Sequence, residues 1–183
     1  MTMLDLILAR EEYNGVPQIG GFRWFHGQEK GELCLEITRH RYGDIRTGND
    51  WVERLTQLTM KVSEDALFVL TSGNYVPYTD PECLLTVVRN AVTYVELERE
   101  VKDMRLLPPT LAVACILREV CFDYMLEDMN LMRIIVMHEP VHDVDGNPCR
   151  LGIFQDGSGN WLDVYYEHPA ALQPRTGYAY LSP

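Results

Sequence analysis

The most apolar helix that this chain can form covers Thr110 to Met129, and it restricts the fold more than any other segment. It follows Pro108-Pro109, a pair that ends one helix and begins the next because proline cannot continue a helix. Apolar side chains occupy most of the predicted circumference, and Glu119, Asp123 and Glu127 form one narrow acidic stripe at four-residue intervals. The segment therefore predicts a core helix that exposes a single line of like charges.

A second helix is predicted before the two prolines. Thr79-Asp80-Pro81-Glu82 supplies a cap, a proline for the first turn and an acid for the helix dipole. Apolar residues then recur at helical spacing, and their phase shifts after Glu96, so the last two turns are expected to contact something different. The two helices predict a helical hairpin over about residues 80–129.

Strand patterns lie on both sides of this helical region. Leu33 to Thr38 alternates between apolar and polar residues, Ala66 to Leu70 is a short apolar run, and Met132 to Met137 is rich in β-branched residues. Arg150 to Gln155 and Asn160 to Glu167 flank Asp156-Gly157-Ser158-Gly159, which predicts a β-hairpin within a C-terminal region of about 131–168.

The expected fold class is α+β: a mixed or antiparallel sheet, built from N- and C-terminal strands, packed on the helical hairpin and one further helix. That further helix begins after Thr47-Gly48-Asn49-Asp50, which offers capping residues. No linker separates two domains, so residues 1–183 are expected to form one domain, with the tail Tyr178 to Leu181 docked on this chain or on a neighbour.

Composition narrows the function classes. The net charge of −11, from 27 acidic and 16 basic residues, disfavours direct binding to nucleic acid or anionic lipid. The basic cluster Arg39-His40-Arg41 with Arg46 is expected to pair with carboxylates of the chain itself. Asp5 interrupts the apolar N-terminal run, and the five cysteines show no CxxC spacing. These features predict a reduced, cytoplasmic protein.

One motif suggests metal chemistry. His138-Glu139-Pro140-Val141-His142 matches the HExxH pattern, in which two histidines bind zinc and the glutamate acts as general base. Pro140 and the β-branched approach to His138 disfavour the helix that this chemistry needs. On a strand the two rings would lie roughly 13 Å apart. A zinc-dependent hydrolase with His138 and His142 as ligands is therefore the alternative, and no catalytic residue or cofactor is predicted in the leading interpretation.

The leading interpretation is an inhibitor, neutraliser or adaptor that acts through protein–protein contact. Its acidic helical region would bind a basic protein surface, plausibly on nucleic-acid-handling machinery, through electrostatic complementarity. A structural subunit of a symmetric assembly, and hence a possible homo-oligomer, is a further alternative. The residues expected at the partner interface are Glu96, Glu100, Glu119, Asp123, Glu127 and Asp128.

Overall fold

The computed structural model of the chain describes residues 22–26, 33–38, 47–73, 75, 82–89, 91, 93–121, 125–166 and 172–182. Within them the fold is α+β, with five helices packed on a mixed sheet in which seven strands have four or more residues. The helices are α2 (Gly48–Gln57), α3 (Glu64–Thr71), α4 (Tyr94–Asp103), α5 (Ala112–Val120) and α6 (Met125–Asp128). The strands are β1 (Phe22–His26), β2 (Leu33–Thr38), β3 (Lys61–Val62), β4 (Glu82–Val88), β5 (Arg133–Val136), β6 (Val141–His142), β7 (Pro148–Asp156), β8 (Gly159–Tyr165) and β9 (Thr176–Leu181).

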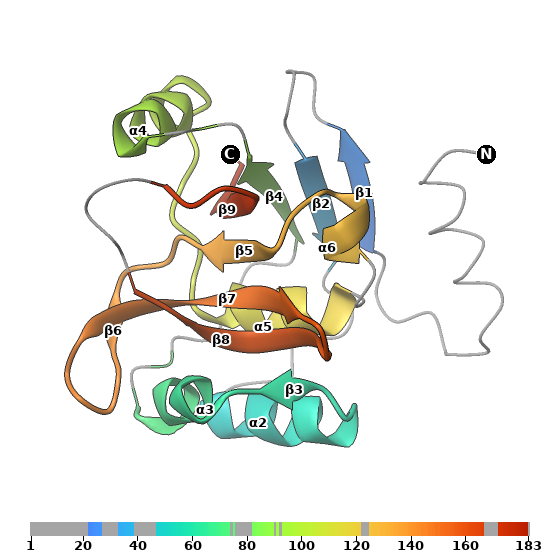
Figure 1. Cartoon of the computed structure of the whole chain (residues 1–183), viewed down its shortest axis with the longest axis vertical. Helices are drawn as coiled ribbons and strands as arrows, with labels where there is room; N and C mark the ends of the chain where they lie inside the picture. The colour runs from blue at the N-terminus through green and yellow to red at the C-terminus, as the bar shows by residue number, and fades with distance from the viewer. Residues whose placement is uncertain are drawn as a thin grey trace, which may run out of the picture.

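The sheet has the strand order β1-β2-β4-β9-β5-β7-β8-β3, and β6 pairs with β7 outside this path (Figure 1). The pairs β5–β9 and β3–β8 are parallel, and the other pairs are antiparallel. The last strand, β9, lies in the middle of the sheet, between β4 and β5. The C-terminal tail is therefore docked on this chain.

Two clusters of buried side chains lie on opposite faces of the sheet, because alternate residues of a strand point to opposite sides. On β5, for example, Ile134 and Val136 belong to one cluster and Ile135 to the other. The larger cluster includes side chains of α2, α3, α5 and α6. The smaller one is covered by α4 and the residues that follow it, which Figure 1 shows at the top of the molecule.

Several elements predicted from the sequence are confirmed. Strands occupy Leu33–Thr38 and Arg133–Val136, and β7 and β8 form the predicted hairpin. Helix α2 begins at Gly48, where the Thr47 side chain accepts a hydrogen bond from the Asp50 N–H in a capping box. The apolar N-terminal run that Asp5 interrupts lies outside the described residues.

The predicted helical hairpin is wrong in its first half. Residues 82–88 form β4, which pairs with β2 on one side and β9 on the other, so that both edges of its backbone are hydrogen-bonded. Its β-branched residues Thr86, Val87 and Val88 suit a pleated strand. The helix begins only at Tyr94, behind a capping box formed by Thr93 and Glu96. The apolar phase shift after Glu96 therefore falls in the first turn of α4, after the strand has already ended at Val88.

Two further elements differ from the prediction. Residues 64–71 are helical and not a strand, because the Ser63 side chain accepts a hydrogen bond from the Ala66 N–H and caps α3. The helix predicted over Thr110 to Met129 ends at Val120, since Cys121 has an extended backbone (φ −92°, ψ 99°), and helicity returns only in α6.

Candidate functional site

The end of α5 at Val120 divides the predicted acidic stripe. Glu119 is buried, and its carboxylate forms a bidentate ion pair with Arg54 of α2, with Nη2–Oε1 at 2.5 Å and Nε–Oε2 at 3.4 Å. The side chain of Glu119 is only 5% exposed. The expectation that Glu119 is solvated and open to a partner is therefore wrong, because an arginine from α2 neutralises it inside the fold.

Among the residues that the structure describes, the predicted interface acids of α4 and of α6 are not brought together. Glu127 is exposed on α6, whereas the Glu96 carboxylate accepts a hydrogen bond from the Thr93 N–H and Glu100 is half-buried, both on α4. Helices α4 and α6 lie on different sides of the molecule (Figure 1). Asp123, the side chain of Asp128 and the basic cluster at 39–46 lie outside the part of the chain that is described.

His138 has a structural place in the fold. Its Nε2 accepts a hydrogen bond from the Leu151 N–H at 2.9 Å, and its Nδ1 lies 2.6 Å from the Glu139 carbonyl oxygen. Because Nε2 accepts, the proton is assigned to Nδ1, which donates to that carbonyl. Burial and the charge of Arg150 lower the pKa of His138 to about 4. Neither ring nitrogen has a lone pair free for zinc, while His142 is exposed on β6.

Asp143 organises the turn between β6 and β7. Its carboxylate accepts hydrogen bonds from the N–H groups of Asp145 and Asn147, from the Asn147 side chain and from the Tyr166 hydroxyl, at 2.7–3.1 Å. Desolvation acts to raise the pKa of Asp143, but these four donors outweigh it and hold the pKa below its usual value. Among the described residues, no group of three His, Cys, Asp or Glu side chains is arranged to hold a metal ion.

The Asp143 turn lies beside α3. Burial raises the pKa of the Cys149 thiol to about 11, and the charges of Asp143 and of Asp65 on α3 act in the same direction. Asp65 also raises the pKa of Tyr166, after burial and the hydrogen bond to Asp143. Figure 1 shows α3 and β6 at the same lower corner of the molecule.

Three large hydrophobic side chains are exposed on these adjacent segments. Phe68 is 38% exposed on α3, Val144 is 62% exposed in the turn, and Tyr166 is 44% exposed after β8. Phe68 stands three residues after Asp65 and so lies on the same side of α3. We name this group the α3–β6 surface: Glu64, Asp65, Phe68, Val144, Asp145 and Tyr166.

The sequence contained one signal for this surface. Asp143-Val-Asp145-Gly146-Asn147 has the composition of a turn in which an aspartate binds the following N–H groups. Gly146 has a φ of +83°, a conformation that favours glycine. The contribution of Tyr166, 23 residues later, follows from the strand pairing and not from any local pattern.

Comparison with protein-family models, with curated protein sequences and with solved structures finds no match to this chain. None of the described helices combines the length and the hydropathy that crossing a bilayer requires.

Proposed function

We propose that the protein acts by protein–protein contact and that its α3–β6 surface binds a basic surface of the partner, as an inhibitor, neutraliser or adaptor. The observation that carries this proposal is the exposure of Phe68, Val144 and Tyr166 beside Glu64, Asp65 and Asp145. Protein interfaces favour aromatic side chains at their centre and polar residues at their rim.

The surface is also held in one shape. Asp143 fixes the turn that carries Val144 and Asp145, and it accepts the hydroxyl hydrogen bond that positions Tyr166. A preformed surface loses less conformational entropy on binding than a mobile one. The net charge of −11 supports the choice of a basic partner, since complementary charge raises the association rate and suppresses wrong partners.

A photo-crosslinking residue at Val144, introduced in the native host, tests the proposal. We expect one dominant crosslinked protein, identified by mass spectrometry, whose purified form binds this chain with an association rate that falls as salt increases. The double variant Phe68→Ser, Val144→Ser should weaken that binding by at least tenfold when it is measured well below the variant's own melting temperature, and Val144→Ser alone, at a position 62% exposed, should weaken it without lowering the melting temperature.

Leu107→Ser is the matched control. Leu107 is 55% exposed and lies in a bridge to Leu181, so it is an exposed apolar residue outside the α3–β6 surface. The proposal fails if Leu107→Ser lowers the affinity for the partner as much as the double variant does. A crosslink to a second copy of this chain would instead favour a symmetric assembly.

A further inference from the structure

Four side chains form a row across neighbouring strands at the β3 end of the sheet. Arg133 of β5 lies opposite Phe154 of β7. Phe154 in turn lies opposite Trp161 of β8, and Trp161 lies opposite Lys61 of β3. Side chains of directly paired residues stand on the same face of a sheet. The row therefore consists of two aromatic rings between two cations, and we name it the cation–aromatic row.

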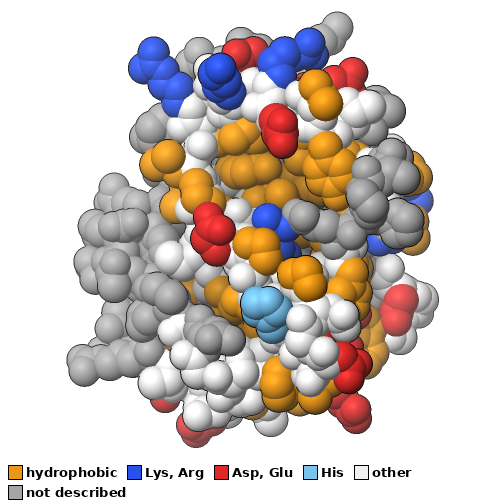
Figure 2. Space-filling model, turned by 90° about the vertical axis from the view of Figure 1, so that its left-hand side faces the viewer, with side chains coloured by type: hydrophobic (Ala, Val, Ile, Leu, Met, Phe, Trp, Pro, Cys, Tyr) orange, Lys and Arg blue, Asp and Glu red, His pale blue; other side chains and the backbone are white. Residues whose placement is uncertain are grey.

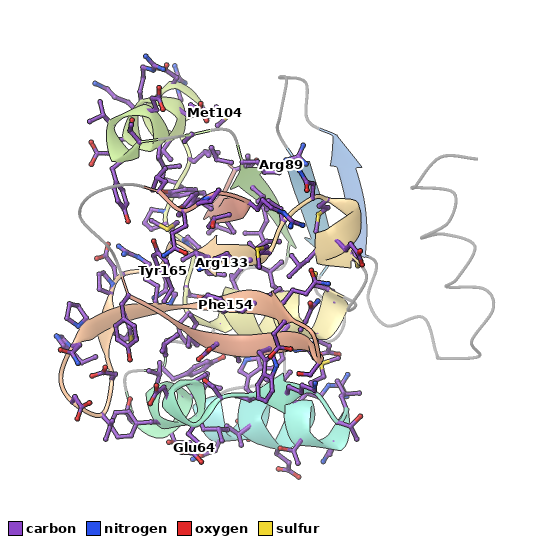
Figure 3. The ribbon with its side chains drawn as sticks, in the orientation of Figure 1. Glu64, Arg89, Met104, Arg133, Phe154 and Tyr165 are labelled. Atoms are coloured by element: carbon purple, nitrogen blue, oxygen red, sulfur yellow. The ribbon has the colours of Figure 1, made fainter. Side chains whose placement is uncertain are left out.

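Each cation lies over the ring next to it. The Arg133 guanidinium carbon is 5.5 Å from the centroid of Phe154, and the Lys61 ammonium nitrogen is 5.2 Å from the centroid of Trp161. Both distances are within the range of cation–π attraction. Figure 3 shows Arg133 of β5 next to Phe154 of β7. The rings thus hold both positive charges at defined places on the sheet.

Hydrogen bonds fix both ends of the row. Arg133 Nη1 donates to the Gln173 side chain, and the Lys61 ammonium group donates to the Ser158 carbonyl. The Nε1 of Trp161 donates to Ser158 Oγ at 3.3 Å. These acceptors are neutral, and in the described part of the chain neither cation of the row forms an ion pair with a carboxylate. Both charges are therefore positioned without being neutralised.

Two acids border the row and limit its positive charge. Hydrogen bonds from Ser158 lower the pKa of Asp156, and the charge of Lys61 acts in the same direction. Lys61 is therefore partly compensated. Asp163 lies two residues after Trp161 and so on the same face of β8. The charge of the row is thus set mainly at its Arg133 end.

A further cation lies near that end. The Met132 N–H donates to the Arg175 carbonyl at 2.8 Å, so Arg175 is next to the residue that precedes Arg133. The Arg175 side chain is exposed, and its Nε donates to the Asn130 carbonyl at 3.3 Å. Two guanidinium groups therefore lie near one end of the aromatic pair.

No described helix covers the face that carries the row. Leu162 and Val164 of β8 point to the larger core cluster, whereas Trp161 between β3 and β7 belongs to neither cluster and is half-buried. Figure 1 shows α5 behind β7 and β8 and no helix in front of them. Tryptophan outside a core is enriched at binding surfaces, because its ring is apolar and its N–H is polar.

The net charge of −11 is not spread evenly over the molecule. On the side drawn in Figure 2, Asp and Glu side chains lie around the lower end, where α3 lies, and Lys and Arg side chains gather at the top, where α4 lies. At physiological salt the Debye length is about 8 Å, so more distant charges are largely screened. A local group of cations can therefore bind an anion on this acidic protein.

We propose that the cation–aromatic row binds single-stranded nucleic acid. Bases would stack on Phe154 and Trp161, and phosphates would contact the cations on either side. Protein surfaces that bind single strands combine aromatic side chains for the bases with cations for the backbone. Lys61 and Arg133 are three strand spacings apart, roughly 14 Å, so the row fits a short stretch of nucleotides. The net charge alone predicts no direct binding, and the same experiment decides between the two expectations.

Fluorescence anisotropy of labelled oligouridine and oligothymidine, each about ten nucleotides long, tests the proposal at physiological salt. We expect saturable binding of at least one strand, at least about tenfold tighter than of a duplex of equal length, whose bases are paired. The ratio of the two affinities shows whether RNA or DNA is preferred. No saturable binding of either strand would overturn the proposal. Equal affinity for polyphosphate, which has no bases, would also overturn it, and so would tighter binding of polyglutamate.

Substitution of the tryptophan tests the stacking. Trp161→Leu should weaken strand binding about tenfold, whereas Trp161→Phe, which keeps an aromatic ring, should retain most of the affinity. Phe68→Leu, at an exposed aromatic position on α3, is the control and should leave the affinity unchanged. Each affinity is measured well below the variant's own melting temperature, because Trp161 is half-buried. Unchanged affinity in Trp161→Leu would contradict the proposal.

Removal of one charge gives an independent measurement. Arg133→Gln should reduce the slope of log Kd against log salt concentration by about 0.7, the value for one phosphate contact on a single strand. Lys102→Gln, at an exposed position on α4, should keep the slope. A lower melting temperature of Arg133→Gln with unaltered affinity and slope would show that Arg133 only stabilises the sheet, against the proposal. Phe68→Ser, Val144→Ser changes no residue of the row and should keep strand binding, so the α3–β6 surface is tested separately.

Discussion

The buried ring of His138 makes the stability of the fold depend on pH. Burial lowers its pKa from the usual value of 6.5 to about 4 in the folded chain. Between these values the unfolded chain takes up a proton that the folded chain does not, so stability is fully present above about pH 6.5 and falls as the pH is lowered towards 4. The expected loss from this residue is roughly 2 kcal/mol between pH 7 and pH 5.

Urea unfolding at both pH values measures this loss. His138→Gln should show a smaller difference in unfolding free energy between pH 7 and pH 5 than the original chain. His142→Gln should keep the full difference, since His142 is exposed. The same pH dependence in all three proteins would assign the effect to other groups.

Glu119 gives a second prediction at this scale. Glu119→Gln should lower the unfolding free energy by about 1–3 kcal/mol, because it leaves Arg54 beside a neutral group at a largely buried position. Glu127→Gln on α6 is the exposed control and should change stability by no more than about 0.5 kcal/mol. An acidic stripe in solvent would give the opposite result, with stability unchanged or raised by Glu119→Gln.

A solvated acidic stripe and a buried ion pair of Glu119 are distinguished only by a contact between residues that are far apart in the sequence. Arg54 stands 65 residues before Glu119, so helical spacing alone could not reveal the ion pair. For His138, Pro140 suffices to disfavour a zinc-binding helix. The partner of Nε2, however, is the Leu151 N–H on β7, which the sequence near His138 does not reveal.

At the scale of the elements, the sequence predicts correctly whether a segment is a helix or a strand where its local patterns all favour the same structure. The alternating pattern of β2 fits only a strand. The turn Asp156-Gly157-Ser158-Gly159 fits only the hairpin of β7 and β8. Residues 82–88 satisfy both a helical and a strand pattern, and pairing with β2 and β9 decides between them. For α3, the cap at Ser63 and the acids Glu64 and Asp65 were the better local signal than the apolar run that follows.

Helix α5 remains the centre of the larger cluster although it is shorter than predicted. All of its residues from Ala112 to Val120 are buried. Val120→Asp should therefore prevent cooperative folding, because an unpaired buried charge costs several kcal/mol, comparable with the stability of a whole domain. Val95→Asp, at a position 75% exposed on α4, should melt like the original chain. A soluble Val120→Asp protein with a normal thermal transition would contradict the central place of α5.

At the scale of the whole molecule, strand order was the part that sequence could not supply. Strand patterns predict which residues are extended, but not that the final strand lies between β4 and β5. The position of β9 joins the strands β1, β2 and β4 to the strands β5, β7 and β8 in one sheet. Whether residues 1–183 fold as one domain stays a prediction.

Gly177 in β9 offers a test of that expectation. A Cβ atom at this position would lie 2.5 Å from Val87 Cγ1 of β4 and 3.2 Å from Leu131 Cδ1. Gly177→Ala should therefore overpack the junction and cost about 1–3 kcal/mol, whereas Gly157→Ala, with no atom within 4 Å, should be tolerated. Hydrogen exchange reports where the stability is lost. If the sheet unfolds as one unit, protection must fall together in β2 and β4 and in β7 and β8, because the substitution lies between them. A loss confined to β5, β7 and β8 would show that the two halves unfold separately, and the chain would then be two cooperative units joined by β9.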